Sequence, residues 1–329
     1  MRFGTKAFLS AFLILCTTLL ASSIQAAEDP LPSWNDGEAK RGIIRFVTEA
    51  VQEGGPNYVA PHDRIATFDQ DGTLWVEHPL YTQAMFALDR VKALAPGHPE
   101  WSATEPFKSI ITGDRAGIAN FGEHDWVQII GVTHSGMDTE VFLSLAKDWL
   151  AASKHPRFHR PYTELIYQPM VEVIKYFQAN GFRTYIVTGG GQEFVRSYSE
   201  KVYGIPAQDV VGSSIVTKYE YKDGQPVLMR MPKVFFVDDH AGKAVGINLF
   251  IGKRPYAAFG NSDGDREMFV RGIGSAVQCQ DDPRRRNHHR GDSDDREAHA
   301  RSHPHIERAA LDSGDVSRDG GGSGWATDI

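Results

Sequence analysis

One stretch decides the fold: Arg64-Ile-Ala-Thr-Phe-Asp69-Gln-Asp71-Gly-Thr73-Leu-Trp75. Its apolar run from Ile65 to Phe68 is typical of a buried strand and ends abruptly in two carboxylates. Because residues i and i+2 of a strand face the same side, Asp69 and Asp71 should point together beyond the strand's carboxyl end. Ligands of open parallel α/β sheets bind in that space, and Gly72 allows a tight turn directly after the pair. We therefore expect a functional site here.

Two carboxylates this close are costly unless a cation lies between them or one of them holds a proton. A Mg²⁺ ion would neutralise the pair and accept a phosphate oxygen as a further ligand. Asp69 could then attack phosphorus and form an aspartyl-phosphate. Asp71 could protonate the leaving alcohol and later activate water. The alternative without function is a strand end followed by an ordinary Asp-Gly turn.

The length of 329 residues suits one large or two modest domains. A hydrophobic content of 41% and a charged content of 23% are ordinary for a globular protein. The formal net charge of −7 argues against a nucleic-acid-binding protein, which would usually carry a basic patch.

The N-terminus, residues 1–26, reads as a cleavable signal peptide. Basic residues precede the apolar run from Ala7 to Leu20, and small residues before Ala26 suit a cleavage site. An uncleaved membrane anchor is the alternative, but the run is short for a span. Cleavage leaves one cysteine, Cys279, so no intrachain disulfide can form. We expect a protein of the bacterial periplasm that no longer contacts the membrane.

The order of elements predicts an α/β fold with an insertion. Helical patterns at residues 81–93, 126–132 and 139–152 follow the first strand, so residues 77–163 should form a helical module over the site, or simply more core. Helices and strands then alternate, which favours a mostly parallel sheet. The expected helices are 36–52, 170–180, 192–202 and 242–250; the expected strands are 182–187, 209–213 and 256–259, with a hairpin of 215–221 and 226–231.

The last segment, residues 279–329, differs from the rest of the chain. It contains only five large apolar residues and no Lys, while Arg, His, Asp and Gly are abundant. Such a segment cannot bury enough surface to offset its ordering entropy, so we expect it to be disordered. Its composition also resembles GC-rich coding sequence read out of frame, which is a hypothesis that resequencing the gene would test.

Three later stretches place polar residues directly after a strand or at the start of a helix. The hydroxyl of Thr188 and the amides of Gly189 and the following glycines could cradle a phosphate. Lys243 could supply a positive charge, in a position that the helix dipole disfavours. Asn261 and Asp265 could offer oxygen ligands to a cation. Taken singly, each is equally typical of a turn or a solvated residue.

Taken together, these stretches resemble the four motifs of the haloacid dehalogenase-like (HAD) superfamily of phosphohydrolases. The motifs are Phe68-Asp69-Gln-Asp71-Gly-Thr73, Val187-Thr188-Gly-Gly, Gly242-Lys243-Ala-Val-Gly-Ile247 and Gly260-Asn261-Ser-Asp-Gly-Asp265. The resemblance covers residues 64–268 and is nearest to exported members of the phosphoserine-phosphatase-like branch. It implies a Rossmann-like parallel sheet with helices on both faces, formed by residues 27–76 and 164–278, and an all-helical cap, residues 77–163.

The resemblance also implies roles for these residues in a Mg²⁺-dependent phosphomonoesterase. Asp69 would be the nucleophile and a metal ligand, and Asp71 the general acid/base with its main-chain carbonyl on the metal. Thr188, Gly189 and Lys243 would hold the phosphoryl oxygens. Asn261 and Asp265 would complete the metal site, although the family often has Asp at the first of these positions. Spacing favours Asp265 over Asp263.

Two other functions stay open: a haloacid dehalogenase, and a non-catalytic periplasmic binding protein on a degenerate fold. Asp71 argues against the dehalogenase, because halide leaves without a proton. The expected substrate is a small phosphorylated metabolite whose identity, like the oligomeric state, the sequence leaves open. Four cap residues are candidates for contacting it, or else belong to the core of the module: Arg115, Phe121, His124 and Trp126.

Overall fold

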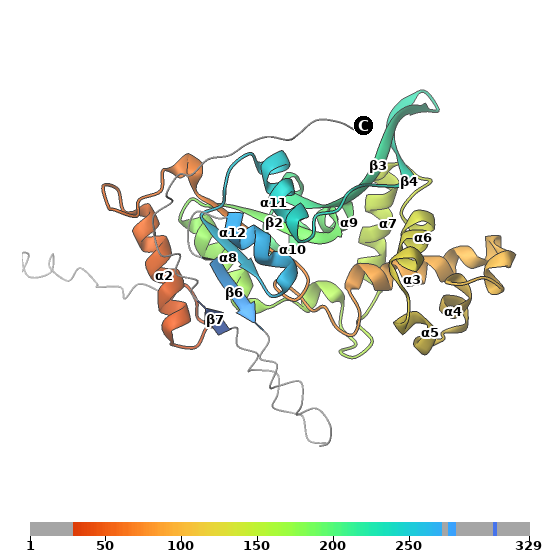
Figure 1. Cartoon of the computed structure of the whole chain (residues 1–329), viewed down its shortest axis with the longest axis horizontal. Helices are drawn as coiled ribbons and strands as arrows, with labels where there is room; N and C mark the ends of the chain where they lie inside the picture. Colours follow the sequence, from red (N-terminus) through yellow and green to blue (C-terminus); the bar gives the residue numbers. More distant parts are fainter. Residues whose placement is uncertain (1–28, 272–275, 281–304, 308–329) are drawn as a thin grey trace, which may run out of the picture.

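The computed structural model describes residues 29–271, 276–280 and 305–307 (Figure 1). They form an α/β fold around one seven-stranded sheet with the order β4-β3-β2-β1-β5-β6-β7. The strands are β1 Ile65–Phe68, β2 Arg183–Gly191, β3 Val210–Lys222, β4 Gln225–Phe236, β5 Ala257–Gly260, β6 Ala276–Gln280 and β7 His305–Glu307. The five central strands are parallel, and β4 and β7 pair antiparallel at the two edges. The predicted mostly parallel α/β sheet is therefore confirmed.

The first strand of the sheet, β1, lies at its centre. Phe68 of β1 is in register with Ile186 of β2 on one side and with Phe259 of β5 on the other. The chain continues from β1 through β2 to β3 on the first side and later adds β5 and β6 on the second. The strand order thus reverses beside β1, which is where open α/β sheets bind their ligands.

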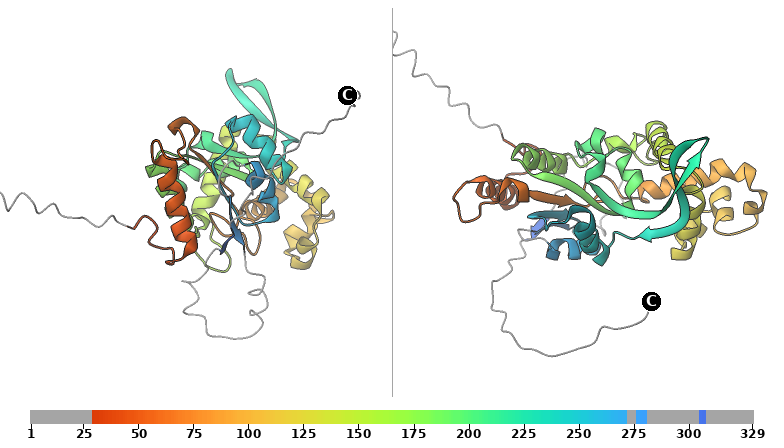
Figure 2. Two further views of the ribbon diagram at one scale, coloured as in Figure 1. Left: turned by 60° about the vertical axis from the view of Figure 1, so that its left-hand side comes forward. Right: turned by 90° about the horizontal axis from the view of Figure 1, so that it is seen from above.

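Helices cover both faces of the sheet, as Figure 2 shows. On one face α2 (Glu38–Val51) and α8 (Gln168–Ala179) pack on the main hydrophobic core. In this core the rings of Phe68 and Phe259 stack at 4.6 Å, and Phe177 packs edge-on against Phe259. On the other face α11 (Ala241–Gly246) and α12 (Arg266–Arg271) pack on β2 and β5. Alternate residues of each strand point into the core on one face of the sheet or into the core on the other. This alternation determines the direction in which the Asp69 side chain points.

The expected helical cap is inserted between β1 and β2. It comprises α3 Thr82–Leu94, α4 Phe107–Thr112, α5 Arg115–Ala119, α6 Glu123–Thr133 and α7 Thr139–Ala152. It has a hydrophobic cluster of its own around Val91 and Ile110, but Phe86 and Phe142 belong to the main core. The cap is therefore continuous with the α/β core rather than a detached module.

The hairpin of β3 and β4 reaches from the sheet onto the cap (Figure 1). The backbone N–H of Arg230 donates to the Met137 carbonyl at 2.9 Å, and the N–H of Gly136 donates to the Arg230 carbonyl at 2.9 Å. The buried Arg230 guanidinium lies 4.1 Å from the ring centroid of Phe142 and 3.2 Å from the Glu193 carboxylate. One side chain thereby joins the hairpin, the cap and the α/β core.

Some elements differ from the sequence expectations. The short strand and the hairpin arms form the two long strands β3 and β4. The helix expected over 192–202 is divided into α9 (Gln192–Arg196) and α10 (Ser199–Tyr203), and α11 continues as a π-helix. The remaining short helices are η1 Pro61–Asp63, η2 Ala95–Gly97, η3 Pro99–Ser102, η4 Tyr162–Glu164, η5 Ala207–Asp209, the π-helix η6 Ile247–Ile251 and η7 Asp263–Asp265.

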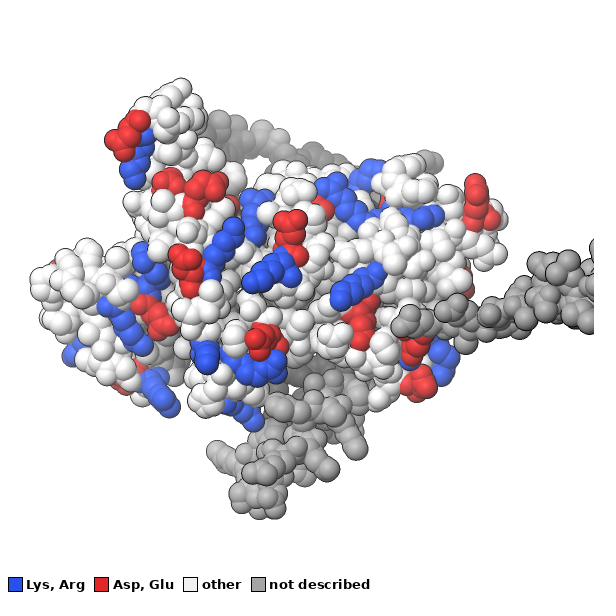
Figure 3. Space-filling model, turned by 180° about the vertical axis from the view of Figure 1, so that it is seen from behind, with Lys and Arg blue, Asp and Glu red and all other residues white. Residues whose placement is uncertain are grey.

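The two ends of the chain are only partly described. Cys279, Gln280 and His305–Glu307 are in paired strands, although they belong to the segment expected to be disordered. The rest of residues 279–329 and the expected signal peptide, residues 1–26, lie outside the described residues. Within the described ranges, no helix has the length and apolar character needed to cross a bilayer. On the face drawn in Figure 3, basic and acidic side chains are interspersed.

Candidate active site

The two aspartates emerge together at the end of β1, as predicted. The backbone N–H of Asp69 donates to the Phe259 carbonyl at 2.8 Å and so continues the ladder with β5. Gln70, between the aspartates, is fully buried, and its Nε2 donates to the Tyr203 hydroxyl at 2.9 Å. Because Gln70 is anchored in this way, the two carboxylates are left on the side of the sheet edge where the ligands of such folds bind.

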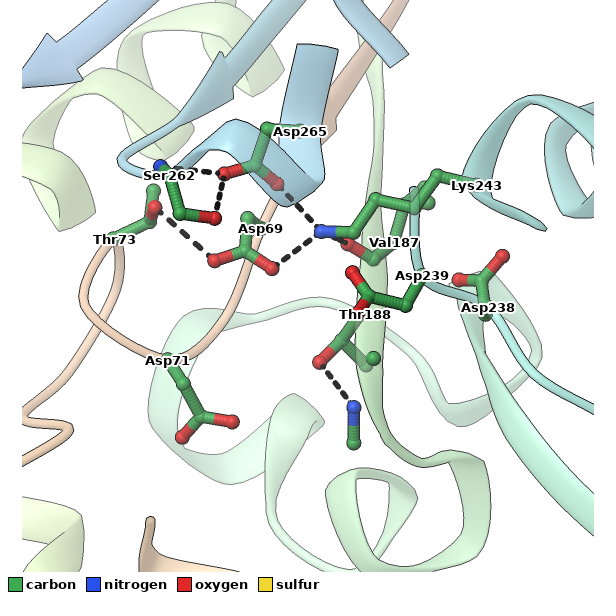
Figure 4. Close-up of polar contacts among 12 residues, drawn as sticks. Asp69, Asp71, Thr73, Val187, Thr188, Asp238, Asp239, Lys243, Ser262 and Asp265 are labelled. Atoms are coloured by element: carbon green, nitrogen blue, oxygen red, sulfur yellow. Dashed lines mark hydrogen bonds and ion pairs between the residues drawn. The ribbon is translucent and has the colours of Figure 1, made fainter. Parts of the chain in front are cut away.

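Lys243, which belongs to the third motif, lies against Asp69 of the first. Its Nζ lies 2.6 Å from Asp69 Oδ1 and 2.6 Å from Asp265 Oδ1, and it donates to the Val187 carbonyl at 3.0 Å (Figure 4). Burial opposes the charge of Lys243, but the two carboxylates raise its pKa, so it remains an ammonium. Burial raises the pKa of Asp69 to about 6, against the opposing effect of Lys243. The cluster is thus a buried pair of acids held by one cation.

Asp265 is fully buried, and both of its carboxylate oxygens have partners within the protein. Oδ1 accepts from Lys243, while Oδ2 accepts from the backbone N–H of Asn261 at 3.0 Å, the N–H of Ser262 at 2.9 Å and the Ser262 hydroxyl at 3.1 Å. These contacts differ from those expected of a direct metal ligand. Asp265 fixes the loop after β5 and the position of Lys243, whereas Asp263 is exposed.

Oxygen atoms converge on the other side of Asp69. The side-chain amide of Asn261 places one atom 3.3 Å from Asp69 Oδ2, 3.0 Å from the Asp71 main-chain carbonyl and 3.0 Å from the Thr73 hydroxyl. With the amide oxygen in that place, a carboxylate, a main-chain carbonyl and an amide carbonyl face one another. Oxygens that share an octahedral Mg²⁺ at its preferred distance lie about 2.9 Å apart.

This set of oxygens fits a magnesium ion. The donors are hard oxygens at suitable separations, and one of them, Asp69, is a carboxylate. Among the described residues, no three His, Cys, Asp or Glu side chains are grouped as a metal site. The candidate site therefore depends on a carbonyl and an amide for its other protein ligands, and it carries less negative charge than a carboxylate cluster.

Asp71 is held by a tryptophan that the sequence motifs did not identify. Trp75 is buried, stacks on Tyr198 at 4.6 Å and donates from Nε1 to Asp71 Oδ1 at 2.7 Å. Burial raises the pKa of Asp71 to about 7, the Trp75 hydrogen bond lowers it, and the neighbouring carboxylates of Asp69 and Glu77 raise it. Such a pKa suits a group that both donates and accepts a proton near neutral pH.

The glycines after Thr188 continue β2 instead of forming a separate loop. The pairing register with β3 shifts between Thr188 and Gly191, so the glycines lie in a β-bulge. The Thr188 hydroxyl, which is buried, accepts from the Gly190 N–H at 3.0 Å. A Cβ on Gly190 would lie 3.3 Å from Thr188 Oγ1 and 3.7 Å from Asp71 Oδ2, so the bulge borders the free oxygen of Asp71.

A glutamine of the cap reaches the same bulge. Gln83 Oε1 accepts from the Gly191 N–H at 2.6 Å, and its Nε2 lies 3.0 Å from His134 Nε2. Burial lowers the pKa of His134 to about 3, so its ring is neutral and can accept this hydrogen bond. No motif identified Gln83, because it is one polar residue in the first turn of an ordinary helix.

Two acidic residues directly before α11 also lie at this edge of the sheet, outside the four motifs. Asp239 is half-exposed, and its side chain lies between the glycine bulge and the loop after β5: a Cβ on Gly189 would be 3.6 Å from Asp239 Cβ, and one on Gly264 would be 2.7 Å from Asp239 Oδ1. Asp238 is buried, and burial raises its pKa to about 7. Their place directly before the Gly242-Lys243 motif was the available signal.

The structure thus brings Asp69, Asp71, Thr188, Gly189, Lys243, Asn261 and Asp265 to one edge of the sheet. Four cap residues were candidates for contacting substrate or for the core of the cap. Phe121 and Trp126 pack edge-on at 5.9 Å beside the cap's own cluster, and His124 pairs with Gln128 on the surface. Arg115 is exposed at the start of α5.

Comparisons with known proteins identify a family. A family model described as haloacid dehalogenase-like hydrolase matches residues 66–269. No match is found among the curated proteins. Among solved structures, the chain is similar to a conserved functionally unknown protein from Anaerococcus prevotii, with a TM-score of 0.49 and 15% identity over 72% of this chain and 83% of that one.

Two further solved structures are similar at comparable identity. A protein of unknown function from Bordetella pertussis gives a TM-score of 0.44 and 17% identity over 68% of this chain and 92% of that one. A phosphoserine phosphohydrolase-like protein from Francisella tularensis gives 0.36 and 13%, over 65% and 86%. These likenesses concern the fold.

Proposed function

The chain belongs to the haloacid dehalogenase-like hydrolases, and from this premise we propose that it is a Mg²⁺-dependent phosphomonoester hydrolase. It would act on a small phosphorylated metabolite through an aspartyl-phosphate. One observation carries the proposal: one oxygen of the Asp69 carboxylate lies 2.6 Å from Lys243 Nζ, and the other lies 3.3 Å from the Asn261 amide, which in turn lies 3.0 Å from the Asp71 main-chain carbonyl. A nucleophile needs such charge neutralisation when it approaches a phosphate dianion.

In the first step, an Asp69 oxygen attacks phosphorus while the bond from phosphorus to the ester oxygen breaks. Asp71 gives its proton to the departing alkoxide, which leaves as the alcohol. Trp75 donates to Asp71 Oδ1, so the other oxygen, Oδ2, is free to carry that proton. Oδ2 is also the oxygen nearest the glycine bulge, where the substrate would lie.

In the second step, Asp71, now a carboxylate, takes a proton from water, whose oxygen attacks phosphorus. The bond between phosphorus and Asp69 breaks, phosphate is released, and both aspartates return to their starting forms. The Thr188 hydroxyl, the Gly189 backbone and Lys243 would hold the phosphoryl oxygens through both steps.

Asp69, the carbonyl of Asp71 and Asn261 would hold the metal, which when bound would neutralise developing negative charge on the phosphoryl group. We assign Asp265 the task of fixing Lys243 and the loop, since both of its oxygens already have partners.

Phosphate release from 4-nitrophenyl phosphate and from a panel of phosphorylated metabolites tests the proposal. Asp69→Asn should lower the rate by orders of magnitude because it removes the nucleophile, and EDTA should do the same reversibly. Asp263→Asn is the matched control, since Asp263 is an exposed carboxylate of the same region. Undiminished activity of Asp69→Asn, or activity that EDTA leaves unchanged, would overturn the assignment.

Two alternatives are tested by the same preparation. The Trp75-held Asp71 favours the phosphatase over a dehalogenase, because a departing halide needs no proton; halide release from 2-haloacids without phosphate release would reverse that preference. Absence of both activities across the panel would favour a binding protein. We also propose export to the periplasm through residues 1–26, which fractionation of the producing cells would test.

A further inference from the structure

Either end of the Asn261 side-chain amide fits the position that faces the cluster, and the two ends have opposite consequences for it. If Nδ2 faces inward, its two N–H groups have three acceptors within reach: Asp69 Oδ2 at 3.3 Å, the Asp71 carbonyl at 3.0 Å and the Thr73 hydroxyl at 3.0 Å. If Oδ1 faces inward, Asn261 accepts from Thr73, but its oxygen faces Asp69 Oδ2 and the Asp71 carbonyl with no proton between them. The first orientation is favourable without a cation, and the second requires one.

The neighbouring residues can accommodate both orientations. The Thr73 hydroxyl can accept from the amide and donate to Asp69 Oδ2, which lies 3.3 Å away, or it can donate to Asn261 Oδ1. On the other side of the amide is Glu77: a Cβ on Gly72 would meet both the Asn261 amide and the Glu77 carboxylate. An outward-facing Nδ2 therefore has a carboxylate nearby.

We propose that Asn261 is a metal-dependent switch, whose NH₂ group takes the place of the cation in the metal-free protein and whose oxygen turns inward when Mg²⁺ binds. This inference rests on the magnesium site of the proposed function. The switch gives a reason for an amide rather than a carboxylate at position 261. A carboxylate would bind the cation more tightly, but without the cation it would be a second unpaired acid against Asp69. The chain thus has a stable metal-free state at the cost of weaker metal binding.

Asn261→Asp tests the inference through stability rather than activity. In EDTA, the midpoint of thermal unfolding should fall by about 5 °C or more, because a donor is replaced by a repelling acid. In saturating Mg²⁺ the variant should instead unfold at a higher temperature than the wild type. The Mg²⁺ dissociation constant of the variant, measured by calorimetry, should be at least tenfold lower than that of the wild type. Gln225→Glu makes the same amide-to-acid change at an exposed hairpin position and should alter neither quantity.

A second measurement covers the case in which Asn261→Asp does not fold in EDTA. The side-chain amide pair of Asn261 in wild-type protein, assigned in ¹⁵N spectra by its absence from the Mg²⁺-loaded variant, should be protected from exchange in EDTA and lose that protection when Mg²⁺ is added. An Asn261→Asp protein at least as stable as wild type in EDTA, or an amide pair unprotected there, would overturn the switch. Neither measurement depends on catalysis, so the switch can fail while the phosphatase activity stands, or hold while it fails.

Discussion

Gln83 of the cap accepts a hydrogen bond of 2.6 Å from the backbone of Gly191, at the far end of the glycine bulge. The other end of the Gln83 amide is fixed by His134, whose neutral ring accepts a hydrogen bond from Gln83 Nε2. The cap therefore holds the strand end that carries Thr188. A phosphate group bound there would depend on a residue that need not touch it.

Gln83→Leu should weaken phosphate binding because it leaves the Gly191 N–H without its acceptor. We expect the inhibition constant of inorganic phosphate to rise about tenfold, the order of one lost buried hydrogen bond. Gln83→Glu keeps the acceptor and should restore most of the loss. Gln128→Leu, which removes the amide of an exposed Gln–His pair in the same cap, is the control. Equal effects of the two leucine substitutions would argue against a specific contact.

Lys243→Met should both inactivate and destabilise the protein. It leaves Asp69 and Asp265 buried without their cation, which typically costs about 3–5 kcal/mol of unfolding free energy. Lys253→Met breaks a pair of similar length, 2.7 Å to Asp63, at an exposed site and should cost about 1 kcal/mol or less. Urea denaturation at neutral pH compares the two, and a similar loss in both would contradict the central place of Lys243.

His134 should make the protein less stable in acid. Burial lowers its pKa to about 3 in the folded state, whereas the unfolded value is about 6.5. Between these values the unfolded chain binds the extra proton, so the unfolding free energy falls as pH falls, by up to about 1.4 kcal/mol per unit.

His134→Gln should lose this part of the pH dependence. Chemical denaturation of the variant and wild type between pH 7.5 and pH 4 measures the difference in slope. His62→Gln, at an exposed histidine, controls for the loss of a histidine as such. A wild-type slope that His134→Gln leaves unchanged would show that other groups account for the acid sensitivity.

Gly72→Ala should damage the site more than its backbone angle alone explains. Gly72 has φ +80°, and a Cβ there would lie 2.7 Å from the Glu77 carboxylate and clash with the Asn261 amide. Gly54 has nearly the same angle, +77°, and open space around it. Gly54→Ala should therefore cost about 1 kcal/mol and leave phosphatase activity unchanged. Gly72→Ala should lower activity at least tenfold, as measured by phosphate release.

The sequence predicts the parts of this fold that local patterns encode. The run Ile65–Phe68 is buried on both faces, so composition identifies it, and alternation alone places Asp69 beside Asp71. Lys243 and Thr188 follow apolar strands or begin helices, and parallel strands bring such positions to one edge.

Other features depend on contacts that no local pattern contains. The sequence patterns 209–213 and 215–221 stop on either side of Ser214, yet β3 runs through both, and at Gly212 it passes so close to Gly190 that a Cβ would lie 2.8 Å from the Gly190 carbonyl. Gln83 meets a backbone N–H that lies 108 residues away in the chain. The sequence left Trp126 and Phe121 open between substrate contact and the core of the cap, because an aromatic side chain buries as well against its neighbour as against a ligand.

The hairpin of β3 and β4 restricts how substrate can enter. Two crossings of the chain and the Gln83–Gly191 hydrogen bond already link the cap to the sheet, and Arg230 adds a further attachment through His134, Phe142 and Glu193. Swinging the cap as a rigid lid would expose that buried guanidinium. Access to the cluster is therefore better suited to small rearrangements than to the swing of a rigid lid.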